Sequence, residues 1–331
     1  MSKRKRKKKL KLRTSFKLFL LILITLFVYF TFFNNKSTKF DLKKMNILNP
    51  IKEHKRQKKI YNECINSPLL EENFNENTIN KKEEIISYAK KYNLRYTFED
   101  LTYNYQINNN ENSSIYGASL IKLVTAIYLI ENDVDLSQTV KYTSKFVSSS
   151  SSGMETRKLG ENVTLKDLMK YSITVSDNTA HHMLVSFIGK NTLKEYATNL
   201  GATAIFTGSS DDYGNQNTHD TNIYLKKAYE LINTKENGSL LKEYMLNTKK
   251  NNLNVNGVVT LGHKYGSYNE YFHDIGINFD NKPYVVSVLT TKGDPEGGKY
   301  INHLSSLTKE FSDLYYANQE TYCKELSKKK D

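Results

Sequence analysis

Three short polar patches, in a fixed order along the chain, hold the residue types that open an amide bond. They are Ser119-Leu120-Ile121-Lys122, Ser176-Asp177-Asn178 and Lys264-Tyr265-Gly266-Ser267. Together they supply a hydroxyl nucleophile with an amine base three residues later, a second hydroxyl, an amide and a second cation. Such a set attacks a carbonyl carbon through the serine oxygen and forms a covalent acyl-serine. The patches therefore predict acyl-transfer chemistry.

The first patch is informative because of the helix that it opens. Residues 119–130 are apolar on nearly every helical face except at Lys122 and Thr125, which predicts a buried helix. Ser119 and Lys122 share one face of that helix, and burial lowers the pKa of a lysine toward neutrality. A lysine that reaches from a core helix to solvent is the alternative. The motif alone says little, because five other serines precede a lysine by three residues: Ser2, Ser87, Ser239, Ser306 and Ser327.

The other two patches each have a simple structural explanation. Ser176 or Asp177 would cap the helix that is expected to begin near Asn178. Lys264 on an edge strand is a common protection against aggregation, whereas Gly266 inside a strand indicates close backbone approach, as when a substrate lies alongside. The functional interpretation rests on the three patches occurring together in this order.

Hydrophobic periodicity predicts the elements that must position these patches. A helix at 81–91 and two short strands at 94–101 and 103–107 precede the first patch. A largely helical block follows, with helices near 119–130, 164–171, 178–188, 193–200, 221–232 and 240–246. The period then changes to strands at 258–268, 272–279 and 284–291, before a last helix at 300–316. This order predicts an α+β domain with a helical insertion.

The chain resembles the class A β-lactamases and the related penicillin-recognising serine hydrolases over about residues 81–318. Besides the three patches, Gly160–Met169, Asn178-Thr179-Ala180 and His273–Ile277 look like that family's framework. The resemblance implies an α/β sandwich: an antiparallel sheet of about five strands with helices on both faces, the first and last helices on one face, plus an all-helical lobe. The site would lie where the sheet and the lobe meet.

The resemblance also implies a role for each residue of the patches. Ser119 would be the acylated nucleophile, Lys122 its base, and Ser176 the donor of a proton to the leaving nitrogen. Asn178 would hold a substrate side-chain amide, and Lys264 would supply positive charge for a substrate carboxylate and for Ser176. Backbone N–H groups of Ser119 and Ser267 would form the oxyanion hole. The full set of substrate-binding residues would be Asn178, Lys264, Tyr265, Gly266 and Ser267.

Two departures from the family pattern bear on the substrate. Tyr265 stands where the family has threonine, and its larger side chain would narrow or block the carboxylate subsite. The glutamate that activates the deacylating water is missing, since no glutamate occurs between Glu195 and Glu230. Only Asp211 and Asp212 could take its place, and a turn is the simpler explanation for that pair.

Three functions are therefore weighed from the sequence. The first is a serine hydrolase that acts on peptidoglycan-type peptides or β-lactams and deacylates slowly. The second is a true β-lactamase that uses Asp211 or Asp212, and the third is a non-catalytic module that binds or senses the cell wall. No cofactor or metal is expected, because His181-His182 is not a metal-ligand spacing and no glycine-rich phosphate loop occurs.

Charge and hydropathy predict where the domain resides. The first 17 residues carry ten cations and no acid, which accounts for ten of the net +13 and gives no case for nucleic-acid binding. Residues 18–33 are uncharged and as a helix would span roughly 24 Å. We expect a single-pass signal anchor with a cytoplasmic basic tail at 1–17 and the rest of the chain outside a bacterial cell membrane. A cleaved signal peptide is the alternative.

The remaining boundaries follow from composition. Residues 34–80 are rich in Asn, Lys and Glu and are expected to form a polar stalk, followed by the hydrolase domain at 81–322 and a charged tail at 323–331. Cys64 and Cys323 bracket that domain. An exterior location permits a disulfide between them, and two free thiols are equally compatible with the sequence.

Overall fold

The computed structural model describes residues 22–26, 48–207, 212–253, 255 and 260–329. The chain divides into two compact units, Met1–Lys58 and Lys59–Asp331. Within the first, residues 22–26 are helical and helix α2 (Leu48–Ile65) begins. No helix within the described ranges combines the length and apolar character needed to cross a membrane. The basic tail at 1–17 and most of the expected anchor at 18–33 fall outside these ranges.

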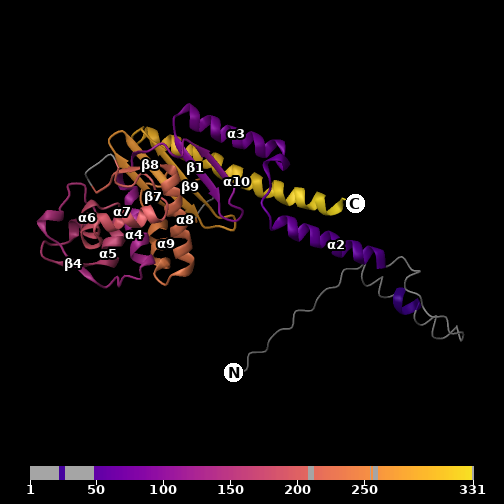
Figure 1. The fold of residues 1–331 in the computed structure, drawn as a ribbon, viewed down its shortest axis with the longest axis horizontal. Coiled ribbons are helices and arrows are strands. Elements are labelled where there is room, and N and C mark those ends of the chain that lie inside the picture. Colours follow the sequence, from indigo (N-terminus) through magenta and orange to yellow (C-terminus); the bar gives the residue numbers. More distant parts are fainter. Residues whose placement is uncertain (1–21, 27–47, 208–211, 254, 256–259, 330–331) are drawn as a thin grey trace, which may run out of the picture. The chain divides into compact units, whose positions relative to one another are not determined.

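The second unit is built on one antiparallel sheet of five strands in the order β2-β1-β9-β8-β7 (Figure 1). This confirms the predicted sheet. Its strands are β1 Arg95–Asp100, β2 Gln106–Asn109, β7 Leu261–Tyr268, β8 Tyr271–Asn278 and β9 Tyr284–Thr290.

The central strand β9 shows why helices cover both faces of the sheet. All seven of its residues are buried, and alternate side chains point to opposite faces. Val286 and Val288 belong to the core under the first and last helices, whereas Val285 and Leu289 belong to the core shared with the helical lobe. The helices that pack on the sheet are α3 Glu76–Lys91 and α10 Glu296–Lys328 on one face and α8 Thr218–Thr234 on the other.

The helical lobe lies beside the sheet, as Figure 1 shows, and confirms the predicted insertion. Its buried centre is the first helix after Ser119, which is apolar on nearly all sides as expected. The helices that complete this part are α4 Lys122–Glu131, α5 Leu165–Thr174, α6 Asn178–Ile188, α7 Lys190–Asn199 and α9 Gly238–Leu246. Its short elements are β3 Ile115–Tyr116, η2 Ala118–Ile121, β4 Thr139–Lys141, η3 Ser144–Phe146, η4 Met154–Thr156, β5 Asn162–Thr164 and β6 Asn215–Gln216.

The structure differs from the expected stalk and tail. Within 34–80, α2 and a short 3₁₀ helix, η1 (Glu71–Asn73), are regular structure, and α3 begins five residues before the expected domain start. Leu69 and Phe74 pack into the core, and the Asn75 side chain caps α3 by accepting from the Thr78 amide. The segment has many charged residues and few apolar ones, so its sequence shows no clear helical periodicity although Leu69 and Phe74 reach the core.

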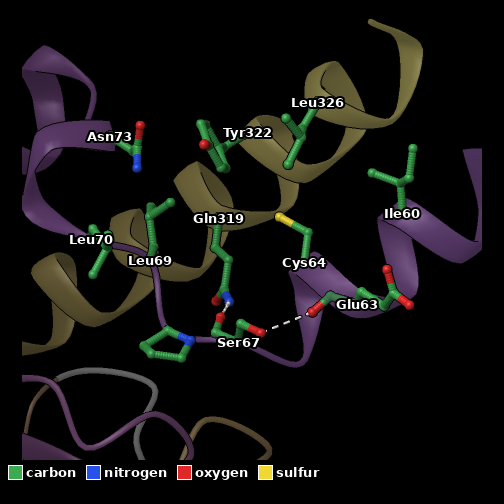
Figure 2. A pocket seen from close by; sticks show the side chains of 11 residues that line it. Ile60, Glu63, Cys64, Ser67, Leu69, Leu70, Asn73, Gln319, Tyr322 and Leu326 are labelled. Atoms are coloured by element: carbon green, nitrogen blue, oxygen red, sulfur yellow. Dashed lines mark hydrogen bonds between the residues drawn. The ribbon is translucent and has the colours of Figure 1, made fainter. Parts of the chain in front are cut away.

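The last helix also extends beyond its expected end near residue 316, and reaches Lys328. A disulfide joins Cys64 to Cys323, which is fully buried within this extension. Figure 2 shows the pocket of about 340 Å³ at this joint, where Gln319 donates to the Ser67 carbonyl. The charged tail expected at 323–331 is therefore mostly helix, tied to α2.

Candidate active site

Ser176 and the residue directly before Ser119 occupy strained backbone positions. Ser119 lies in the tight turn η2, directly after Ala118, whose φ is 45°. Ser176 precedes α6 and itself has a φ of 56°. Left-handed conformations at residues other than glycine cost about 1–3 kcal/mol and concentrate at functional sites. Both hydroxyls are thus held by backbone geometry that the surrounding packing must maintain.

The Lys122 amine lies at the centre of a closed polar network. Its Nζ is 2.9 Å from Ser119 Oγ and 3.2 Å from Ser176 Oγ. It donates to the Ser176 carbonyl and to Asn178 Oδ1, both at 2.6 Å. A neutral amine has two N–H groups and one lone pair, so these two short bonds leave the lone pair for the Ser119 hydroxyl. The network fits a base that receives the Ser119 proton.

The electrostatic setting favours that neutral form. The Lys122 side chain is completely buried, and burial holds the pKa of its amine well below the usual range for lysine. The nearby Lys264 lowers this pKa further, while Asp177 opposes the shift. The alternative of a lysine reaching solvent is therefore excluded by its burial.

Lys264 joins the same network from strand β7. Its Nζ donates to Ser176 Oγ at 2.9 Å and to the carbonyl of Tyr265 at 2.6 Å. The Ser176 hydroxyl therefore lies between two amines. Burial lowers the pKa of Lys264 to about 7, although Asp274 partly opposes this shift. At neutral pH this side chain is divided between its charged and neutral forms.

The departure at Tyr265 places a ring inside the site. The half-buried ring centroid is 4.4 Å from Lys264 Nζ. Burial raises the pKa of the phenol, and a hydrogen bond with the Ser176 side chain partly offsets this effect. The Tyr265 ring thus lies against the amine of Lys264.

Gly266 allows β7 to approach the turn that carries the nucleophile. A Cβ at this position would lie 2.9 Å from the Gly117 carbonyl oxygen and 3.2 Å from the Ser119 amide nitrogen. The close approach inferred from the sequence is therefore to the chain itself and not to a substrate. It places the exposed Ser267 beside the backbone of the Ser119 turn, where the two predicted oxyanion-hole donors would meet.

Asp177 holds the second patch in place. One carboxylate oxygen caps α6 by accepting from the Ala180 amide at 2.8 Å. The other accepts from the Ser151 hydroxyl and from three consecutive backbone amides. Backbone amides of this kind lower the pKa of Asp177 even though its side chain is fully buried. The capping role expected from the sequence is only part of this function, because Asp177 also fixes the serine-rich loop at 148–153.

In the described part of the loop that follows the lobe, from residue 212 onward, the carboxylate of Asp212 does not join the network. The Asp212 carboxylate lies 3.8 Å from Lys190, and its side chain is 36% exposed. Asp211 falls outside the described residues. The side chain that faces the network is instead Tyr213, whose ring centroid lies 5.7 Å from Lys122 Nζ.

Two histidines of α6 fix this loop. His181 is fully buried, and its Nε2 lies 3.2 Å from the Asp212 carbonyl oxygen. Burial and the nearby Lys122 keep the pKa of His181 well below its usual value. His182 Nε2 is 3.4 Å from the Tyr213 hydroxyl. Sequence reasoning missed Tyr213 and these contacts, because one tyrosine among 24 carries no distinguishing signal.

A family model described as "Beta-lactamase enzyme family" matches residues 77–312 of the chain. The chain belongs to this family. The match covers all three patches and all five strands of the sheet, and it agrees with the resemblance seen in the sequence. No curated protein matches the chain.

The chain also matches solved structures of similar fold, and each match extends over almost all of the solved chain. A PBP-A mutant, solved as an acyl-enzyme complex with penicillin G, is 17% identical with a TM-score of 0.63 over 70% of this chain and 96% of that chain. TLA-1 extended-spectrum β-lactamase is 18% identical, with a TM-score of 0.62 over 71% and 99%. A β-lactamase from Sphaerobacter thermophilus is 17% identical, with a TM-score of 0.60 over 71% and 97%. At these identities the likeness concerns the fold.

Proposed function

We propose that this protein is a serine hydrolase that forms an acyl-serine at Ser119 on β-lactams and on peptidoglycan-type peptides, and that releases the acyl group slowly. The observation that carries the proposal is the buried Lys122 amine, 2.9 Å from Ser119 Oγ, with its two N–H groups engaged elsewhere. A positioned base of this kind contributes about 10²–10⁴-fold to a proton-transfer step.

The acylation steps balance within this network. As Ser119 Oγ bonds to the substrate carbonyl carbon, its proton passes to the neutral Lys122 Nζ. The carbonyl electron pair moves to oxygen, where the backbone N–H groups of Ser119 and Ser267 would stabilise it. When the C–N bond breaks, Ser176 Oγ gives its proton to the leaving nitrogen and takes the proton that Lys122 holds 3.2 Å away. Lys122 is neutral again when the acyl-serine has formed.

We expect slow release of the acyl group because of the side chains that the described part of this loop places near Lys122. Hydrolysis of an acyl-serine needs a base beside the attacking water. The Asp212 carboxylate is paired with Lys190, and the Tyr213 ring covers the side of Lys122 that faces the loop. No observation favours the alternative in which Asp212 drives rapid β-lactam turnover.

The proposed location is the outer side of a bacterial cell membrane. The ten cations before an uncharged stretch at 18–33 support a single-pass anchor with the domain outside. The Cys64–Cys323 disulfide supports an oxidising environment for that domain. A spheroplast experiment tests this location: added protease should remove the domain from intact spheroplasts, and a protected full-length chain would contradict it.

Labelling with a fluorescent penicillin tests the proposed activity. The wild-type protein should be labelled covalently, and Ser119→Ala should lose about 10⁴-fold or more of the labelling rate. Ser239→Ala is a matched control, because Ser239 also precedes a lysine by three residues but is exposed in α9. Labelling that survives Ser119→Ala, or a wild type that is never labelled, would reject the proposal in favour of a non-catalytic module.

A further inference from the structure

At most one hydrogen-bond donor of Lys264 is left for a substrate. An ammonium group has three N–H donors. Two of them serve Ser176 Oγ and the Tyr265 carbonyl, and the Tyr265 ring lies 4.4 Å from the nitrogen. The Lys264 side chain is also completely buried. A carboxylate that enters the site would therefore meet an aromatic ring before it met this cation.

Tyr265 stands at the position where the resemblance implies a threonine that receives a substrate carboxylate. The residue follows Lys264 on β7, and its ring centroid lies 4.4 Å from Lys264 Nζ. A single phenol hydroxyl stabilises a bound carboxylate far less than an accessible ammonium group would. A small side chain at this position would leave the ammonium group accessible. The ring also fills volume beside the Lys264 amine.

Lys122 and the arginines of the described domain do not replace this function. Lys122 is fully buried, with its bonds directed to Ser119, Ser176 and Asn178. Arginine is the usual bidentate partner of a carboxylate. The domain's two arginines within the described ranges lie elsewhere: Arg157 pairs with Glu161 and Asp167, and Arg95 lies on β1, which β9 and β8 separate from β7.

We infer that Tyr265 makes this site select acyl donors whose leaving group carries no carboxylate beside the scissile bond. This inference rests on the proposed acyl-serine function and names its substrate class: esters, or amides whose leaving amine is uncharged and has its carboxyl group blocked or absent. β-Lactams still acylate Ser119, but their carboxylate contributes little to the rate.

A matched pair of acylating agents tests the inference on the purified full-length protein. Benzylpenicillin and its methyl ester differ only in that carboxylate, and second-order acylation rates are followed by intact mass. Each rate is divided by the rate of alkaline hydrolysis of the same compound, which removes the difference in intrinsic reactivity. The wild type should give an acid-to-ester ratio within about threefold of one, because an ion pair that binds would add roughly tenfold or more.

Two substitutions assign the effect to the ring. Tyr265→Thr should raise the acid-to-ester ratio at least about tenfold, since it exposes Lys264 to the substrate. Tyr265→Phe keeps the ring and should keep the wild-type ratio. A wild type that prefers the acid by about tenfold or more overturns the inference and leaves the proposed function standing. If neither compound acylates Ser119, the proposed function fails and this inference fails with it.

Discussion

Two regions of the molecule contact Lys122: the polar network at its amine and the loop after the helical lobe. They differ in the groups that they place near the amine. On one side, Ser119, Ser176 and Asn178 direct oxygen atoms at its amine within 3.2 Å. On the other side lies the Tyr213 ring, and the Asp212 carboxylate is directed to Lys190. The groups proposed to form an acyl-serine and the described residues of this loop therefore belong to separate parts of the fold, so the proposed acylation and deacylation steps can be changed independently.

The largest effect on the acylation rate is expected for Lys122→Met. Methionine keeps most of the buried volume but removes the base, so the acylation rate should fall by about 10³-fold. Lys242→Met is the matched control, because Lys242 follows Ser239 at the same spacing and lies over the Phe279 ring instead. Stopped-flow or intact-mass kinetics measure the rate. A loss below about tenfold would show that the Ser119 proton leaves by another path.

The second largest effect on the acylation rate is expected at the contact between strand β7 and the turn that carries Ser119. Gly266→Ala would place a methyl group 2.9 Å from the Gly117 carbonyl and 3.2 Å from the Ser119 amide. The turn that carries Ser119 must then move, and misplacement by about 1 Å costs roughly 10²-fold in rate. Acylation kinetics beside a thermal unfolding curve separate this effect from loss of the fold. Unchanged acylation in a folded variant would contradict the assigned position of Ser267.

The pH dependence of acylation should be bell-shaped. Lys122 must be neutral to act as a base, so protonation at low pH lowers the rate. Lys264 has a pKa lowered to about 7, so it is charged below this pH and loses its charge above it. If the charge assists Ser176, the rate falls by up to about tenfold per pH unit above neutrality. Lys264→Met should remove this alkaline limb, and a variant that keeps the limb would assign it to another group.

The smallest effect is expected on the loop side. Asp212→Asn should leave the lifetime of the acyl-serine within about threefold of the wild type, because an exposed pair with Lys190 is worth little. The lifetime is measured by intact mass after excess β-lactam has been removed. A large change would favour the true β-lactamase that the sequence also allowed.

Much of the acylation network was accessible from the sequence. Ser119 and Lys122 share a helix whose lack of any polar side predicts burial, and the fold follows from the order of helices and strands. The pairing of Ser176 with Lys264 was an expectation of the family resemblance, and the structure brings these two groups together and adds Lys122 to them. Their catalytic roles remain predictions.

The contacts of the loop after the lobe and the helical extensions outside the expected domain could not be predicted from the sequence in the same way. Tyr213 approaches Lys122 through contacts with His181 and His182 that no spacing reveals. The left-handed conformations at Ala118 and Ser176 fall on residues that do not favour them, so tertiary packing decides them. The disulfide between Cys64 and Cys323 depends on a helical extension in a charge-rich segment.

Intact mass of the full-length protein after a brief exposure to benzylpenicillin, followed over time, tests the central claim most directly. The account predicts that one penicillin adds to each chain, that Ser119 carries it, and that the adduct persists for many minutes after free penicillin is removed. Rapid return to the unmodified mass would contradict slow release. Absence of any adduct would contradict the assignment of Ser119 and Lys122 as nucleophile and base.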